Sequence, residues 1–311
     1  MTDELATLTG VELDRAVHPA VSALAAQLAA RGGGHVAAVL FYGSALRDDA
    51  LDGVLDFYVL TDRHGAWPGS RLAAFANRLL PPNVGYLEAD VGGRRLRAKY
   101  AVMTLSQFRR AMAMQRIDTT LWARFSQPCA CVFARGDADR LAARAAVCEA
   151  VITASRWAAA LGPARGEATD HWRALYLRTY AAELRVERNS RGADLIERDS
   201  ERYARLLPLA WTAAGLAFER DAEGRLAPSM NTAERTSAER RWRWRQRLGR
   251  PLNLLRLLKA ALTFDNAIDY VAWKVERHSG HRIEPSAFQR RHPLLAAPAL
   301  YWRLRALKVL R

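Results

Sequence analysis

Short apolar runs and alternating polar positions dominate the first third of the chain. Residues 35–42 and 54–61 are apolar and rich in β-branched and aromatic side chains, which is typical of buried strands. Residues 84–91 and 94–104 flank a Gly-Gly pair and predict a β-hairpin. These segments predict a mixed sheet within an α/β (α+β) domain.

Helical spacing of apolar residues takes over further along. Before residue 136 it predicts helices over residues 13–31 and 70–80 and two short ones near 106–125; after residue 137 it is almost continuous. A polar stretch at residues 221–239 has the composition of a loop or linker. We therefore expect three regions: an α/β domain at 1–136, a helical domain at 137–235, and a basic helical region at 236–311.

Charge narrows the choice of partner. The 311 residues include 47 Lys and Arg against 32 Asp and Glu, a net charge of +15, which favours anionic partners. No apolar run is long enough for a transmembrane helix, and the acidic N-terminus argues against a targeting peptide. Cys129, Cys131 and Cys148 are expected to be buried thiols, since three cysteines give no disulfide framework. The expected location is the cytoplasm, on the inner face of the cell membrane.

The stretch FYGSALRDDALDGVLDFYVLTD carries the candidate chemistry. Gly43 and Ser44 end one predicted strand and Asp56 lies in the next, a layout that suits a triphosphate held by the turn and a magnesium ion held by the carboxylate. The usual second acid, two residues on, is replaced by Tyr58. A common turn and an isolated strand aspartate would give the same pattern.

The missing acid would have to come from another strand. Strand alternation places Glu88 and Asp90 on one face of the hairpin, so either could join Asp56 on the metal, and a solvated hairpin edge is the alternative for both. Asp62 is expected to cap the strand end. Lys99 shares a face with Arg95 and Arg97 and would suit an anionic phosphate, or would simply belong to a solvated basic face.

Four segments, FYGSAL, VLDFYVLTD, GRRLRAKYAVMT and LWARFSQP, occur in this order. As an ordered set they resemble the mitochondrial type of CDP-diacylglycerol synthase, a phosphatidate cytidylyltransferase family within the nucleotidyltransferase superfamily. The likeness covers roughly residues 38–135. The matching positions are Tyr42, Gly43, Ser44, Asp56, Asp62, Lys99, Tyr100, Arg124 and Pro128. The sequence departs from the family pattern at Ala45, Ala101 and Gln127, and Gln127 removes a charge.

The resemblance implies a nucleotidyltransferase-like fold and a Mg²⁺-dependent transfer of CMP from CTP to phosphatidic acid, giving CDP-diacylglycerol and pyrophosphate. Under this interpretation nucleic acid is not an expected partner. The implied residues are Asp56, Lys99 and Glu88 in catalysis, Tyr42, Gly43, Ser44 and Arg124 at the nucleotide, and Asp56 with Glu88 or Asp90 at the metal.

A lipid acceptor requires contact with an anionic membrane surface. The segment RRWRWRQR, with Trp242 and Trp244, and an amphipathic C-terminal segment are typical of such contacts. In the C-terminal segment we expect contact by Trp302, Arg303, Arg305 and Lys308. The leucines of PLNLLRLLK, residues 251–259, are instead expected to pack on the protein's own core.

Two other functions fit the same residues. One is a nucleotidyltransferase that acts on another small-molecule or lipid phosphate. The other is a non-catalytic basic protein that binds RNA or membrane through residues 240–247 and has lost the activity of its pocket. Nucleotide turnover distinguishes the two classes.

Overall fold

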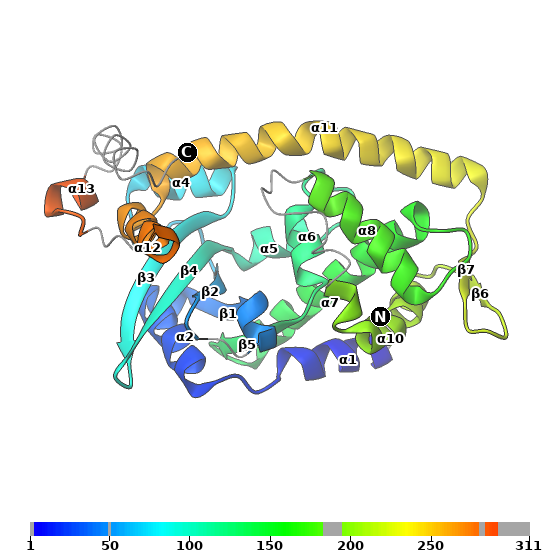
Figure 1. Cartoon of the computed structure of the whole chain (residues 1–311), viewed down its shortest axis with the longest axis horizontal. Helices are drawn as coiled ribbons and strands as arrows, with labels where there is room; N and C mark the ends of the chain where they lie inside the picture. Colours follow the sequence, from blue (N-terminus) through cyan, green and yellow to red (C-terminus); the bar gives the residue numbers. More distant parts are fainter. Residues whose placement is uncertain (1–2, 49–50, 183–194, 280–283, 292–311) are drawn as a thin grey trace. The chain divides into compact units, whose positions relative to one another are not determined.

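The computed structural model describes residues 3–48, 51–182, 195–279 and 284–291 (Figure 1). The chain divides into two units. The first unit consists of residues 1–16 and 105–255, and the second of residues 17–104 and 256–311. Each unit is thus assembled from two separate stretches of sequence, which differs from the three contiguous regions expected from composition. Helix α11 (Thr232–Thr263) carries the chain from the first unit into the second.

The first unit is mainly helical and is organised around the 25-residue helix α7 (Asp137–Leu161). Helix α7 contacts α1 (Asp3–Leu13), α5 (Leu105–Ala111), α6 (Thr120–Phe125), α8 (Ala168–Ala182), α10 (Ser200–Ala213) and strand β5 (Cys129–Ala134). A small hairpin of β6 (Phe218–Arg220) and β7 (Leu226–Pro228) precedes α11.

Large aromatic side chains form the core of the first unit. The fully buried tryptophans are Trp122, Trp157, Trp172, Trp211 and Trp242. The indole N–H of Trp172 donates to the carbonyl oxygen of Tyr203 at 3.1 Å, and that of Trp211 donates to the carbonyl oxygen of Ser155 at 2.9 Å. Burial of this aromatic surface stabilises the first unit.

The second unit contains four strands of a mixed sheet in the order β3-β4-β2-β1. Their bounds are β1 (Val36–Tyr42), β2 (Val54–Thr61), β3 (Asn83–Val91) and β4 (Arg94–Thr104). Strands β1 and β2 are antiparallel, β2 and β4 are parallel, and β3 and β4 form an antiparallel hairpin. Strand β4 therefore lies between β3 and β2.

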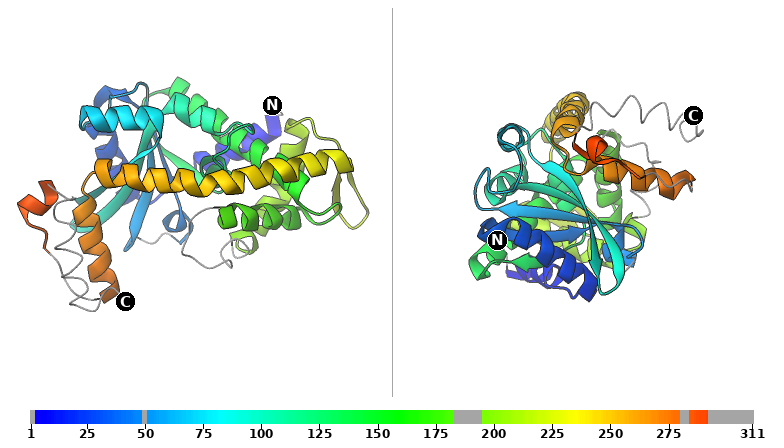
Figure 2. Two further views of the ribbon diagram at one scale, coloured as in Figure 1. Left: turned by 90° about the horizontal axis from the view of Figure 1, so that it is seen from above. Right: turned by 90° about the vertical axis from the view of Figure 1, so that its left-hand side faces the viewer.

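Helices surround this sheet. They are α2 (Pro19–Arg31), α3 (Ser44–Asp48), α4 (Arg71–Leu79), the end of α11, α12 (Ala267–Ser279) and α13 (Ala287–Arg291), and a short 3₁₀ turn spans Gly33–His35. Helix α2 packs against β1, β2 and β3, whereas α12 packs against β3. Figure 2 shows the chain from two further directions.

The segment before α12 joins the edge of the sheet. Asp265 forms a parallel bridge with Gly85, and its carbonyl oxygen accepts from the N–H of Tyr86 at 3.0 Å. Its carboxylate accepts from the hydroxyl of Tyr100 at 2.6 Å and pairs with Arg31 at the end of α2. A Cβ at Gly85 would lie 2.4 Å from the Tyr100 ring, so only glycine leaves room for this connection.

The predicted elements agree with the structure where their pattern was strong. The mixed sheet with helices, followed by a mainly helical chain, is confirmed, as is the Gly92-Gly93 hairpin. The single helix expected over residues 13–31 is instead two helices, because Pro19 begins α2 and the ring of His18 accepts from the N–H of Ala20. The stretch 221–239 is not a linker: it contains β7 and the first two turns of α11.

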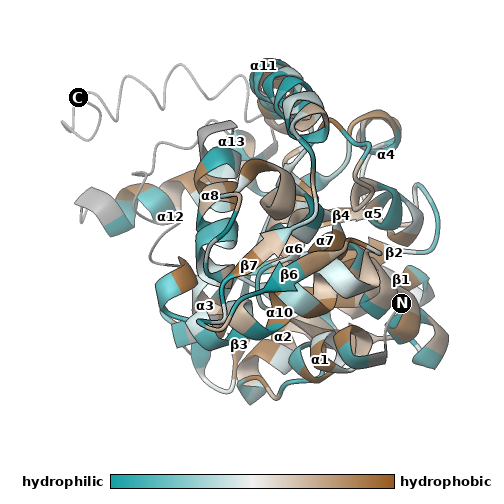
Figure 3. Cartoon of the chain, turned by 90° about the vertical axis from the view of Figure 1, so that its right-hand side faces the viewer, coloured by the Kyte–Doolittle hydropathy of each residue, from teal (hydrophilic) through white to brown (hydrophobic). Residues whose placement is uncertain are grey.

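The cysteines and the helix surfaces agree with what the composition predicts. Cys129, Cys131 and Cys148 are free and buried as predicted, and burial raises the pKa of the Cys129 thiol to about 12. Figure 3 shows mainly hydrophilic residues along the end of α11 nearest the viewer. Among the described residues, no helix combines the length and the apolar character needed to cross a bilayer.

Candidate functional site

The Gly43-Ser44 turn lies directly against Asp56. Strand β1 ends at Tyr42, Gly43 has a φ of 97°, and Ser44 begins α3. A Cβ at residue 43 would lie 3.2 Å from Oδ2 of Asp56, so both the backbone conformation and the close approach favour glycine. The carboxylate and the turn therefore form one small polar site at the end of β1.

Register places a row of four side chains across the sheet. Tyr42 on β1 pairs with Asp56 on β2, Asp56 pairs with Lys99 on β4, and Lys99 pairs with Tyr86 on β3. Directly paired residues on neighbouring strands project from the same face of a sheet. The sheet thus brings together the carboxylate of Asp56 and the ammonium group of Lys99, which are 43 positions apart in the sequence.

Helix α12 supplies aromatic rings to this face. The Nζ atom of Lys99 lies 6.0 Å from the centre of the Tyr270 ring, which is 5.5 Å from the Tyr86 ring. The guanidinium group of Arg97 lies 5.8 Å from the Trp273 ring. Burial, and then the negative charge of Asp56, raise the pKa of the Tyr270 hydroxyl. Tyr270 therefore lies close to both the Lys99 ammonium group and the Asp56 carboxylate.

Glu88 takes part in a separate ion-pair network. Its carboxylate pairs with Arg95 and lies 3.5 Å from Nε of Arg97, and it accepts from the Tyr86 hydroxyl at 2.7 Å. Burial and this hydrogen bond raise the pKa of Tyr86, which remains a neutral donor. The carboxylate of Glu88 therefore interacts with residues of β3 and β4.

The structure does not bring Glu88 or Asp90 to Asp56. Because β4 separates β3 from β2, register puts the Cα atom of Glu88 roughly 12 Å from that of Asp56. Asp90 is further along and accepts from the N–H of Gly93 at 3.0 Å, which closes the hairpin turn. Among the described residues, no cluster of three or more His, Cys, Asp or Glu side chains could hold a metal ion. The hairpin therefore does not supply the second acid that the sequence predicts there.

Other residues matched by sequence lie elsewhere. Asp62 follows the end of β2 and pairs with His35 at 3.3 Å, as a strand-end residue would. Arg124 is half-buried on α6 and belongs to the first unit, whereas Gly43, Asp56 and Lys99 belong to the second.

The predicted membrane residues have different environments. Trp242 is buried against Trp122 and Trp157, so its predicted membrane contact is wrong. Trp244 is exposed. Trp302, Arg303, Arg305 and Lys308 lie outside the described residues.

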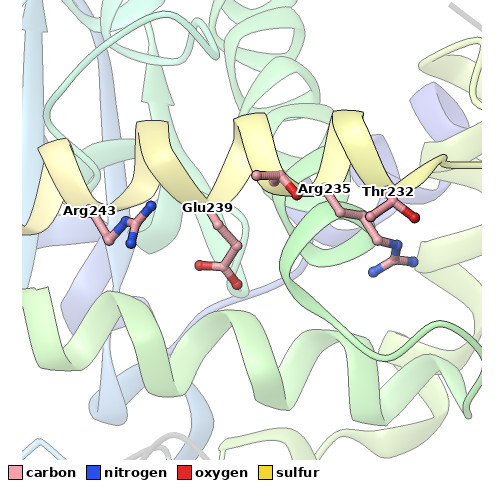
Figure 4. A pocket seen from close by; sticks show the side chains of 5 residues that line it. Thr232, Arg235, Glu239 and Arg243 are labelled. Atoms are coloured by element: carbon pink, nitrogen blue, oxygen red, sulfur yellow. The ribbon is translucent and has the colours of Figure 1, made fainter.

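A surface hollow of about 380 Å³ lies along α11 in the first unit (Figure 4). Its lining consists of Thr232, Arg235, Thr236, Glu239 and Arg243. Glu239 is paired with Arg178 of α8 at 2.8 Å, and Arg235 donates to the carbonyl oxygen of Gly162 at 3.0 Å. These bonds connect helices, and none of the predicted site residues lines this hollow.

Comparison with known proteins gives little further information. No family model matches the chain, and no curated protein matches it. Among solved structures, a protein described as nucleotidyltransferase-like from Exiguobacterium sibiricum aligns over 93% of this chain and 88% of its own, with 13% identity and a TM-score of 0.26. A TM-score this low does not establish a shared fold.

Tyr270 and Trp273 are the site residues that sequence reasoning missed. They lie more than 160 positions beyond Lys99, in a helical run where aromatic residues are ordinary core positions. Trp273 is half-buried, and Tyr270 reaches the site only because Asp265 joins the edge of β3. No local pattern in the sequence encodes that connection.

Proposed function

We propose that this protein is a nucleotidyltransferase, and that it transfers CMP from CTP to phosphatidic acid to give CDP-diacylglycerol and pyrophosphate. One observation carries the proposal: the carboxylate of Asp56 lies against the Gly43-Ser44 turn while Lys99 stands beside it on the next strand. The nucleotide CTP and the lipid acceptor come from the ordered resemblance of residues 38–135 to mitochondrial-type phosphatidate cytidylyltransferases.

Three parts of the site would contact the triphosphate of CTP. The N–H groups of the Gly43-Ser44 turn and the Ser44 hydroxyl would donate to triphosphate oxygens, and glycine lets the phosphates approach the backbone. The Lys99 ammonium group would offset the charge that builds up on the transferring phosphoryl group. Tyr42, beside Asp56 in register, would line the same site.

A magnesium ion fits this site through Asp56. Magnesium is typically bound by one or two carboxylates, and substrate phosphates and water complete its six ligands. Asp56 supplies that single carboxylate next to the turn where the phosphates would bind, whereas Glu88 and Asp90 are engaged elsewhere. When bound, the ion would neutralise charge on the triphosphate.

The transfer itself needs positioning more than proton removal. An oxygen of the phosphatidate phosphate forms a bond to the α-phosphorus of CTP, and the bond from that phosphorus to the bridging oxygen breaks as pyrophosphate leaves. The attacking oxygen already carries negative charge at neutral pH, so no strong general base is required. This chemistry fits a site that offers the carboxylate of Asp56, the ammonium group of Lys99 and the hydroxyl group of Ser44.

The direct test is turnover with labelled CTP, Mg²⁺ and vesicles containing phosphatidic acid. We expect labelled lipid from the wild type and a loss of about 10²–10³-fold or more in kcat for Asp56→Asn and Lys99→Met, since each removes a charge from the transition-state site. Asp62→Asn is the matched control, because Asp62 pairs with His35 at the strand end. EDTA should abolish turnover and added Mg²⁺ should restore it.

Two results would contradict the proposal. Absence of labelled lipid from the wild type at every vesicle composition would rule out this acceptor, and turnover of a different phosphate acceptor would identify another nucleotidyltransferase. If Asp56→Asn retains full turnover, the site is elsewhere.

A further inference from the structure

Helix α4 has its large apolar side chains on the outside. Leu72, Phe75 and Leu79 recur at helical spacing and are about 60–70% exposed, and none of the helix's residues is buried. Its inner side is made of smaller residues: Asn83 donates to the carbonyl oxygen of Ala73 and its N–H donates to the side chain of Asn77. A helix in a soluble domain ordinarily buries its apolar stripe, so this orientation is reversed.

The end of α11 repeats the same arrangement within the second unit. Leu257, Leu258 and Leu262 are each about 60% exposed. At about 100° per residue these leucines share one side of the helix, and Arg256 lies on the opposite side. Arg256 donates to the carbonyl oxygen of Pro81 at 3.3 Å, so the polar side of the helix is attached and the apolar side is not.

The two helices that carry the exposed stripes are connected by a hydrogen bond. Lys259 of α11 donates to the carbonyl oxygen of Leu80, the residue that follows α4, at 2.6 Å. In the left view of Figure 2 both α4 (cyan) and the end of α11 (gold) face the viewer. We call the exposed set the leucine surface; it consists of Leu72, Phe75, Leu79, Leu257, Leu258 and Leu262.

Charge around the leucine surface is of one sign. Residues 63–87 and 256–264, which belong to the second unit, contain no Asp or Glu but include Arg63, Arg71, Arg78, Arg256 and Lys259. A second copy of the chain docked on this surface would bring these cations together, which disfavours self-association. Nucleic acid would match the charge but would leave the leucines in water. An anionic bilayer satisfies both, because its headgroups meet the cations and its acyl region takes up the apolar side chains.

We propose that the leucine surface docks the second unit in the plane of an anionic lipid bilayer. The inference deepens the proposed function and rests on it for the lipid nature of the acceptor, but docking requires no turnover. It assigns membrane contact to α4 and the end of α11, and it replaces the contact expected at Trp242.

The test compares two matched double variants in sedimentation with vesicles of phosphatidylglycerol and phosphatidylcholine. Phe75→Gln/Leu258→Gln removes two exposed residues of the leucine surface, and Val11→Gln/Leu141→Gln removes two similarly exposed residues of the first unit. The first pair should lower the apparent partition coefficient by at least about tenfold, because apolar burial contributes directly to interfacial binding. The second pair should leave it within about twofold. Unchanged thermal melting of all variants would exclude unfolding as the cause.

Several outcomes overturn the inference. These are a wild type that does not sediment with anionic vesicles, equal losses in the two double variants, or a wild-type oligomer in analytical ultracentrifugation that Phe75→Gln/Leu258→Gln dissociates. Asp56→Asn separates docking from catalysis: it should bind vesicles as the wild type does. Vesicle binding without any turnover in the wild type would leave the docking surface intact and remove the proposed function.

Discussion

The two halves of helix α11 differ in composition, and each has the environment opposite to the one that its composition suggests. In the first half, Trp242 is buried between the edges of Trp122 and Trp157, and Arg245 is almost fully buried over the Trp157 ring at 4.5 Å. In the second half, Leu257, Leu258 and Leu262 are exposed while Arg256 and Lys259 make the contacts. One helix therefore buries an arginine and a tryptophan, and exposes its leucines.

An amphipathic pattern in the sequence identifies the two sides of a helix but not what each side contacts. The sequence predicts membrane contact at Trp242 and core packing for the leucines of residues 251–259, whereas in the structure Trp242 is buried and most of these leucines are exposed. Trp242 is buried because it packs against the rings of two other tryptophans of the first unit, Trp122 and Trp157. The leucines are outside because the end of the helix is anchored through main-chain carbonyl oxygens at residues 80–82.

The largest expected effect lies in the first half of the helix. Trp242→Ala should lower the free energy of unfolding by about 3–5 kcal/mol, because it leaves a cavity between two buried rings. Urea unfolding followed by circular dichroism measures this. Trp244→Ala, two positions away and exposed, should change stability by less than about 0.5 kcal/mol. Equal losses in the two variants would mean that the environments of the two tryptophans are not different.

A smaller effect is expected at Lys259 and depends on pH. Burial, and then the charge of Arg256, lower the pKa of the Lys259 ammonium group from 10.5 to about 8. Between these two values the unfolded chain binds more protons than the folded one, so this group makes stability rise with pH over that window. Urea unfolding at pH 8 and at pH 10 should show the rise in the wild type. The rise should be reduced in Lys259→Met; an identical pH slope in both proteins would contradict the assignment.

The smallest effect on stability is expected at the exposed leucines. Leu262→Ser should change the free energy of unfolding by less than about 0.5 kcal/mol, because the side chain is already in water. Leu206→Ser, at a fully buried position of α10, is the contrasting variant and should cost several times more. A loss at Leu262 as large as that at Leu206 would show that the second half of α11 is covered in solution.

Strand positions are the part of the fold that the sequence predicts best. Strand β2 has the expected bounds, Val54–Thr61, because β-branched and aromatic residues pack on both faces of a sheet and the run ends in polar residues. The same local information identifies Gly43, Ser44, Asp56 and Lys99 as candidates. Strand order is not local, however. The error at Glu88 and Asp90 arose because β4, which follows β3 in sequence, lies between β3 and β2.

The aromatic part of the site was beyond sequence reasoning for a related reason. Tyr270 contacts Tyr86 and Lys99 because the segment before α12 joins the edge of the sheet, where Asp265 bridges to Gly85, a residue 180 positions away. The physical requirement is visible only in three dimensions, where the ring of Tyr100 occupies the space that a side chain at residue 85 would need. A glycine in a strand indicates a close approach, but not which group approaches.

The interleaving of the two units has a consequence for biosynthesis. Residues 3–13 pack on helices α7 and α10, which are synthesised only after the strands at 36–104. The β3 edge of the sheet is completed only when residues 264–279 have been synthesised. Each unit therefore has to bring together segments that are synthesised far apart in time, so neither can fold as a separate contiguous domain while the chain is being made.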